Sequence, residues 1–455
     1  MKPVTVKRSL SPAATKGLLA PLGKAWKNYA AAFPGDPEER QPVHSVYGGA
    51  HLFKADTGKK FSELALKGLR ENAPDAATLT SALNLDPRLA TTIYERVQQK
   101  LLREAVEDFR IDFEDGYGNR PDAEEDGHAT EAAEEVAQGL AQGTLPPFIG
   151  IRIKPLTAEL AARSLRTTDI FLSTLLARTR NKLPSGFVVT LPKIVAKEQV
   201  SITAKTLAAI EKAHKLKAGA LRMELMVETT QSVFSPGGDV ALPELIKAGG
   251  GRIRGAHLGT YDYTAGCNIT AQYQSMTHPA CDFAKHVMQV SLAATGVTIS
   301  DGATNVMPVP PHRVKAGQTL TAEQAAENRE AVHRVWRLHY EHVRHSLRQG
   351  FYQGWDLHPG QLPTRYAAVY AFFLEGLEQS SARLKNFIER AAQATLQCEV
   401  FDDAATGQGL LNYFLRALNC GAISLSDIEA TGLTVAEIQT RSFAQILKGR
   451  RGTAA

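Results

Sequence analysis

The sequence predicts an α/β fold, a (β/α)8 TIM barrel that carries an N-terminal extension and a C-terminal helical extension. Short runs of β-branched and aromatic residues alternate with longer stretches rich in Ala, Glu, Lys and Leu from about residue 45 to about residue 380. Eight such runs can be counted, and charged side chains fall late in several of them. Eight strand–helix units close a barrel more naturally than they make an open sheet.

The strand candidates follow one another with helix-forming segments between them, among which are 123–142, 156–181, 198–217 and 322–348. The fourth and fifth candidates are nearly continuous apolar runs, as expected where a parallel sheet is covered on both faces. The eight candidates are HSVYGGAHLF at 44–53, FRIDFED at 109–115, FIGIRIK at 148–154, GFVVTLPKI at 186–194, LRMELMVET at 221–229, IRGAHLGTYDY at 253–263, VTISDG at 297–302 and GFYQGWDLH at 350–358.

The boundaries of these units divide the chain into three parts. Residues 1–43 form an N-terminal extension, residues 44–399 the barrel and catalytic domain, and residues 400–455 a C-terminal helical extension. Apolar residues recur among polar ones in this last segment, so it needs a surface to pack against. We expect it to serve either as a lid over the barrel mouth or as a buttress that stabilises the barrel or joins subunits.

Composition limits the class of partner. The net charge is +5, but the 52 Lys and Arg are spread among 47 Asp and Glu, which argues against nucleic acid. The four cysteines form no CxxC pair and are typical of reduced thiols. No apolar run has the length of a membrane span or a signal-peptide core. We expect a cytoplasmic protein, a homo-oligomer without a membrane partner, that acts on a small molecule.

Two acidic residues end neighbouring strand candidates. Glu228 closes the run LMV and Asp262 follows GAHLGTY in the next candidate. Adjacent parallel strands lie about 5 Å apart, so both side chains can reach one small ion. Mg²⁺, with Mn²⁺ as an alternative, suits two carboxylates completed by water and substrate oxygens. The alternative is that the two acids cap successive helices.

Arg152 lies between isoleucines in FIGIRIK, where an unpaired guanidinium would be costly to bury. Its partner is expected to be a substrate carboxylate, held by two parallel hydrogen bonds. The alternative is an internal ion pair with Glu114 or Asp115. Strand alternation predicts that Asp112 and Glu114 face one side of the strand and Asp115 the other.

Two further residues are candidates at the same barrel face. Lys193 follows a proline that ends its strand, and we expect its ammonium group to project into the mouth as a catalytic residue. His358 ends the last strand candidate and could donate to a substrate carbonyl, or be structural. By contrast, the histidines at 339, 342 and 345 recur on a charged helix and are predicted to lie on a solvated surface.

The order of these motifs resembles the citrate lyase beta-subunit-like and malyl-CoA lyase group of the HpcH/HpaI aldolase superfamily, whose barrel is related to that of malate synthase. The resemblance covers roughly residues 45–370 and rests on IDFEDGYG, IRIK, LPKI, VET, GTYDY and HPGQ. It implies a magnesium ion on Glu228 and Asp262, and Arg152 on the substrate carboxylate or carbonyl. Tyr261 and Lys154 depart from the family pattern.

Together these features predict a Mg²⁺-dependent carbon–carbon lyase or aldolase. The substrate would be a 2-oxo or 3-hydroxy acid, or its CoA thioester, and the cation and Arg152 would stabilise an enolate. The expected catalytic residues are Arg152, Glu114, Asp115 and Lys193, with Arg152 and His358 binding substrate. Two alternatives stay open: a phosphoenolpyruvate- or pyruvate-type enzyme on a related barrel, and a non-catalytic barrel that binds a metabolite.

Overall fold

Eight parallel strands form the barrel in the computed structural model, which describes residues 8–37, 39–313, 319–389, 395–397, 400–402, 404–429 and 431–453. The sheet order is β7-β6-β5-β4-β3-β2-β1-β8. The barrel strands are β1 (His44–Gly49), β2 (Asp108–Asp112), β3 (Phe148–Arg152), β4 (Val188–Leu191), β5 (Arg222–Val227), β6 (Ile253–Leu258), β7 (Thr298–Ser300) and β8 (Gly354–Asp356). The predicted (β/α)8 barrel and its eight strands are confirmed.

The ends of the sheet meet just beyond β7. Asp301 donates its backbone N–H to the carbonyl of Gln353 over 2.9 Å, and Trp355 donates to the carbonyl of Gly302 over the same distance. These bonds bring β7 and β8 together, so the sheet closes on itself and has no free edge at this point.

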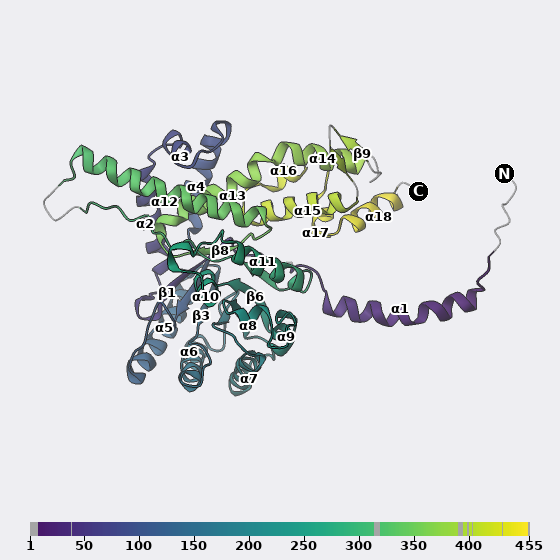
Figure 1. Cartoon of the computed structure of the whole chain (residues 1–455), viewed down its shortest axis with the longest axis horizontal. Coiled ribbons are helices and arrows are strands. Elements are labelled where there is room, and N and C mark those ends of the chain that lie inside the picture. Colours follow the sequence, from purple (N-terminus) through teal and green to yellow (C-terminus); the bar gives the residue numbers. More distant parts are fainter. Residues whose placement is uncertain are drawn as a thin grey trace.

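Helices surround the barrel and follow its strands (Figure 1). Those between strands are α2 (Thr57–Asn72), α3 (Ala76–Leu83), α4 (Ala90–Glu104), α5 (Asp122–Gln142), α6 (Ala161–Thr179), α7 (Lys197–Ala213), α8 (Thr230–Val233), α9 (Leu242–Ala248), α10 (Thr260–Gly266), α11 (Pro279–Leu292) and α12 (Ala322–Arg348). After β8 come α13 (Leu362–Glu375), α14 (Leu377–Glu389), a hairpin of β9 (Thr395–Gln397) and β10 (Val400–Asp402), α15 (Ala404–Asn419), α16 (Leu425–Glu429), α17 (Val435–Gln439) and α18 (Phe443–Thr453). No helix among the described residues is both long and apolar enough to cross a bilayer.

The helices after β8 share the core of the barrel. Leu411 and Phe414 of α15 are fully buried in the same apolar cluster as the strands. Asn419 donates its side-chain N–H over 2.7 Å to the carbonyl of Gln41, three residues before β1 begins at His44. Since β1 begins at this end of the barrel, the segment packs against the face opposite the strand carboxyl ends. This position is the one expected of a buttress, and the role of the segment, lid or buttress, stays a prediction.

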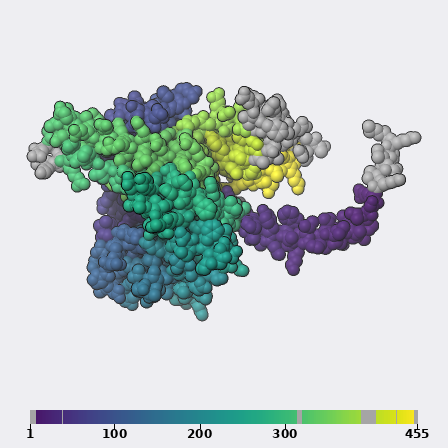
Figure 2. Space-filling view, viewed as in Figure 1, coloured from purple at the N-terminus to yellow at the C-terminus, as the bar shows by residue number. Residues whose placement is uncertain are grey.

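The first helix is the exception to this packing. Helix α1 (Pro12–Ala32) has no buried residue and stands away from the barrel (Figures 1 and 2). The segment that follows its C-terminal end is attached to the barrel, because Gly35 donates its backbone N–H over 2.8 Å to the carbonyl of Ala294, just after α11.

The prediction of a solvated histidine face on α12 is wrong. His339 is fully buried and lies 2.9 Å from Asp356 at the end of β8. His342 is also buried, and its Nδ1 lies 2.9 Å from the hydroxyl of Thr304. The charged residues between these histidines suggested a solvated helix, but one side of α12 packs on the barrel.

Candidate active site

The predicted site residues gather at the carboxyl ends of β2 to β6, the end of a (β/α)8 barrel where catalytic groups collect. Glu228 comes directly after β5, and its backbone is fixed because Thr229 caps α8 by accepting the N–H of Ser232 over 3.0 Å. Asp262 lies in the first turn of α10, four residues after β6 ends. The expectation that Asp262 closes a strand is therefore wrong, although the residue still reaches the mouth.

Lys193 lies at the centre of the carboxylates. Its ammonium donates to Glu114 over 2.5 Å and to Asp115 over 3.0 Å, and lies 3.8 Å from an oxygen of Asp262. Its backbone N–H donates to Glu228 over 2.6 Å. This last bond is possible because Lys193 adopts a left-handed backbone conformation, with φ 48°, after Pro192 ends the strand.

Glu228 is almost completely buried, with 2% of its surface exposed. Burial raises the pKa of its carboxyl group to about 8, and the negative charges of Glu114 and Asp262 act in the same direction. The pKa of Asp262 is also raised by burial, even though its side chain is half-exposed. An additional positive charge would therefore stabilise the ionised form of both groups.

Arg152 at the end of β3 is held by carboxylates of its own chain. It donates through Nε and Nη2 to both oxygens of Asp112, over 2.7 and 2.5 Å, and its Nη1 lies 2.9 Å from Glu114. The guanidinium also stacks 4.9 Å from the centre of the Tyr47 ring. The internal ion pair with Glu114, named as the alternative, is thus present, and Asp112, which was not named for it, is the main partner of Arg152.

The alternation predicted for the acids after β2 does not hold beyond Asp112. The carboxylate of Asp112 accepts the backbone N–H groups of Glu114 and Gly116 over 3.0 and 2.7 Å, which turns the chain away from the sheet. Glu114 and Asp115 both lie in this turn and both contact Lys193. Asp112, which positions Arg152 and the turn, was not expected to be a site residue.

Gly259 is a second residue that the sequence did not single out. A Cβ atom added to it would lie 2.4 Å from both Cβ and Oε2 of Glu228. The Glu228 side chain therefore occupies the space that a side chain at position 259 would need. A lone glycine in HLGTYD gives no sign of this, because the close approach involves a residue thirty-one positions earlier.

A cleft of about 700 Å³ opens beside these groups and is lined by Lys193, Glu228 and Asp262 together with Thr157, Gln199 and Gln231 among others. His358 does not belong to this set: its Nδ1 accepts the N–H of Gly360 over 3.0 Å and begins the short helical turn Pro359–Gln361. Lys154, the departure in the IRIK motif, is buried on the carbonyls of Phe113 and Gly118 and pairs with Glu125, so it stabilises the loop.

Two carboxylates on neighbouring βα units, with room beside them, fit a hard divalent cation that keeps several waters. Among the described residues no group of three or more His, Cys, Asp or Glu side chains could hold a metal. A site of two carboxylates completed by water and substrate is consistent with this finding. Glu228 is also almost completely buried beside Gly259, and a cation there would offset the cost of burying its charge.

A family model with the description "Domain of unknown function (DUF6986)" matches residues 22–446. The chain belongs to this family. No curated protein matches the sequence.

Solved structures share the barrel. A citrate lyase from Burkholderia xenovorans LB400 superposes with a TM-score of 0.54 at 16% identity, over 87% of this chain and 97% of that chain. CitE from Mycobacterium tuberculosis, in complex with magnesium, acetoacetate and coenzyme A, has a TM-score of 0.48 at 15% identity, over 83% and 98% of the two chains. A magnesium/glyoxylate complex of Haloferax volcanii malate synthase has a TM-score of 0.48 at 14% identity, over 90% and 99%. At such identities the similarity to the citrate lyase establishes a common fold.

Proposed function

We propose that this DUF6986 protein is a carbon–carbon lyase or aldolase that acts on a 2-oxo or 3-hydroxy acid, or its CoA thioester, with a divalent cation on Glu228 and Asp262. The observation that carries the proposal is the convergence of these two carboxylates with Lys193, Glu114 and the cleft at the strand carboxyl ends. The ordered motifs from IDFEDGYG to HPGQ support the same reaction class. The shared fold with the citrate lyase from Burkholderia xenovorans is consistent with this proposal.

The chain itself supplies the positive charges and the proton carriers. When bound, the cation would provide a Lewis acid for the oxygen at which negative charge develops as the bond breaks or forms. Arg152, fixed by Asp112 and by the Tyr47 ring, adds a second positive charge that needs no rearrangement during the reaction. Lys193 keeps Glu114 and Asp115 in place and balances their charge.

Glu114 is the group best placed to carry a proton. Burial raises the pKa of its carboxyl group, although Arg152 and Lys193 oppose this shift. Cleavage of a 3-hydroxy acid requires a base at the hydroxyl group, and the reverse reaction requires the same group as an acid. Asp115 has its pKa lowered by Arg152 and Lys193, so it serves better as a fixed negative charge.

The test is an enolisation assay that needs no knowledge of the second substrate. The protein is incubated with Mg²⁺ in D₂O and a panel of 2-oxo acids and acyl-CoA thioesters, and exchange of the proton next to the carbonyl is followed by NMR. We expect exchange with at least one compound, and a loss of about 100-fold or more in Glu228→Gln and Asp262→Asn.

The exposed pair partner Glu71→Gln is the matched control and should exchange at the wild-type rate, because its side chain is 61% exposed on α2. Exchange that is equally fast in wild type and in both site variants would refute the assignment. Binding of a panel compound without any exchange would favour the metabolite-binding alternative.

A further inference from the structure

Helix α1 exposes an apolar face that its own chain leaves uncovered. Leu19, Leu22, Trp26 and Tyr29 recur at spacings of three and four residues, so they align along one side of the helix. Trp26 is 63% exposed, Tyr29 53% and Leu22 48%. An isolated helix with such a face is stable only when another surface covers it.

The aromatic residues of this face are already arranged relative to one another. The rings of Trp26 and Tyr29 meet edge to face at 5.8 Å, and Tyr29 lies 5.0 Å from Phe33, which ends the helix. Rigid aromatic side chains lose little conformational freedom on binding and commonly anchor interfaces.

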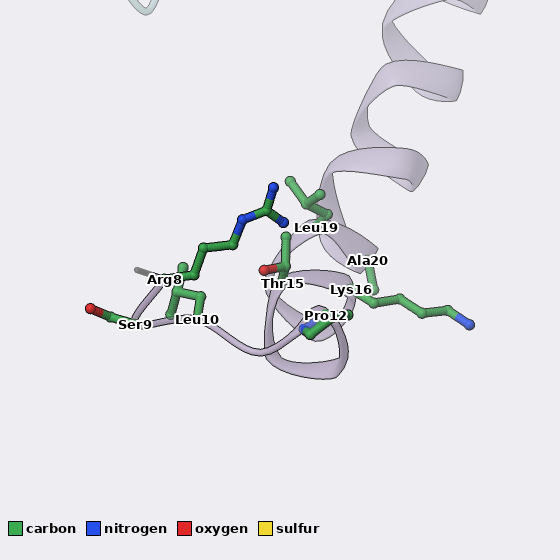
Figure 3. A pocket seen from close by; sticks show the side chains of 8 residues that line it. All are labelled: Arg8, Ser9, Leu10, Pro12, Thr15, Lys16, Leu19 and Ala20. Carbon is green, nitrogen blue, oxygen red and sulfur yellow. The ribbon is translucent and has the colours of Figure 1, made fainter. Parts of the chain in front are cut away.

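The charge of the chain is concentrated in the same segment. Residues 1–35 contain six Lys and Arg and no Asp or Glu, so residues 36–455 have 46 basic against 47 acidic residues. On α1 the basic residues Lys16, Lys24 and Lys27 lie outside the apolar face, and Figure 3 shows Lys16 and Leu19 pointing to different sides of the helix. The partner surface should therefore be apolar at its centre and acidic at its rim.

The barrel carries a groove of this description between α7 and α9. This α7–α9 groove has a volume of about 420 Å³ and is lined by apolar residues that include Val195, Val240 and Leu245. Val195 is 51% exposed and Val240 38%. Three acidic residues, Glu198, Asp239 and Glu244, also line it, against the single base Lys197.

The groove adjoins the candidate active site. Val195, Ala196 and Gln231 line both the α7–α9 groove and the cleft that contains Lys193, Glu228 and Asp262. A segment seated in the groove would therefore border the cleft and help to exclude water from it.

We propose that α1 of one copy of this chain docks in the α7–α9 groove of a second copy, with Trp26 and Tyr29 as its apolar anchors. The family model begins at residue 22, so the half of α1 that contains these anchors belongs to the shared domain. A helix that belongs to the domain but buries nothing in its own copy is explained by assembly of the domain with itself. Opposite charges on helix and groove favour this pairing over contact between two α1 helices, which would bring like charges together.

The first test is self-association of the full-length chain, measured by analytical ultracentrifugation. We expect the double variant Trp26→Ser, Tyr29→Ser to weaken self-association by about tenfold or more. Tyr273→Ser is the matched control, since Tyr273 is 65% exposed and lies outside both surfaces. Because no residue of α1 is buried, the double variant leaves the barrel folded, which circular dichroism checks.

The second test identifies the surface on which α1 docks. A photoreactive p-benzoylphenylalanine replaces Trp26 in ¹⁵N-labelled chain, which is mixed with unlabelled chain before irradiation and mass spectrometry. Cross-links from the labelled copy to residues 195–198 or 231–245 of the unlabelled copy support the proposal. A monomer at all concentrations, cross-links confined to one copy, cross-links to another surface, or binding to phosphatidylglycerol vesicles in place of self-association would each overturn it.

Discussion

Arg152 is the residue whose geometry most limits substitution. Its planar guanidinium makes two parallel bonds to Asp112 and also reaches Glu114, and an ammonium group cannot reproduce the parallel pair. We expect Arg152→Lys to lower kcat/KM by about 2–3 kcal/mol of transition-state stabilisation, and to lower the melting temperature as well, because Asp112 is buried and would lose a partner. Steady-state kinetics and calorimetric melting measure the two effects.

The control is Arg166→Lys on α6, an arginine whose side chain is 61% exposed and which pairs with Asp126. It should match wild type in both measurements. Full turnover in Arg152→Lys would show that Arg152 is only a structural residue.

Gly259 makes a steric prediction that is independent of charge. The methyl group in Gly259→Ala would overlap the Glu228 side chain, whose Cβ and Oε2 are both 2.4 Å from the new atom. Because φ at this position is −94°, alanine meets no backbone penalty there, so any effect comes from the displaced carboxylate. We expect divalent-cation affinity to fall by about tenfold or more, measured by titration calorimetry.

Gly266→Ala is the matched control on the same helix, since its added Cβ meets nothing closer than 3.9 Å. Equal cation affinity in the two alanine variants would remove Gly259 from the site.

The residues that could be predicted were those with a charged side chain late in an apolar run. Glu228, Arg152 and Lys193 were found in this way because period-two burial makes a charge in a strand conspicuous. Asp112 also ends a strand, but the sequence does not show that its carboxylate pairs with Arg152 at the end of the neighbouring strand. Gly259 was missed because its role is a contact with Glu228 of another βα unit. The left-handed backbone conformation of Lys193 could not be predicted either, since a lysine does not indicate a positive φ.

At the scale of elements, the buried histidines of α12 predict that the stability of the protein depends on pH. Burial lowers the pKa of His342 to about 4, and the neighbouring His339 contributes to the shift. As pH falls from about 6.5 toward 4, the unfolded chain takes up a proton that the folded chain does not, so the free energy of unfolding decreases. The contribution of this group is up to about 3 kcal/mol, fully present above pH 6.5.

Urea unfolding of wild type and His342→Gln between pH 4 and pH 7 measures the contribution of His342 to the free energy of unfolding. We expect a shallower dependence in the variant, with the other titrating groups cancelling in the comparison. Parallel curves for the two proteins would contradict the buried, neutral state of His342.

Helix α15 makes a prediction about stability. Phe414 is fully buried in the core that α15 shares with the barrel. We expect Phe414→Ala to decrease the free energy of unfolding by about 3–5 kcal/mol, measured by urea denaturation, and to leave cation affinity unchanged because α15 packs at the opposite end of the barrel. Leu425→Ala, at a position 47% exposed, is the control and should cost well under 1 kcal/mol. A small loss at Phe414 would indicate that the segment after residue 400 is not part of the barrel core.

Element type was easier to predict than element environment. The eight strands and the four helical segments named between them follow from hydrophobic periodicity and were recovered, whereas α1 was not predicted. The buried side of α12 was missed because three histidines and several arginines give the helix a polar composition. The position of Asp262 on α10 was missed because the strand-forming residues Thr260 and Tyr261 continue the pattern past Leu258, where the strand ends.

The whole molecule combines a closed barrel, a group of helices packed at one end and an uncovered helix at its side (Figure 1). The barrel brings Glu228, Asp262 and Lys193 from separate βα units to one cleft. The proposed docking of α1 would make the environment of that cleft depend on a second copy, so activity should depend on protein concentration if α1 assists closure. The cation site itself requires only one copy.

The most direct test of that site is Mn²⁺ binding to the full-length protein, followed by electron paramagnetic resonance or titration calorimetry. A site on Glu228 and Asp262 predicts one bound ion per chain in wild type and in Asp239→Asn, whose exposed carboxylate lies outside the cleft, and a loss of affinity of about tenfold or more in Glu228→Gln and in Asp262→Asn. Wild-type affinity in both site variants, or no saturable binding to the wild-type protein, would contradict it.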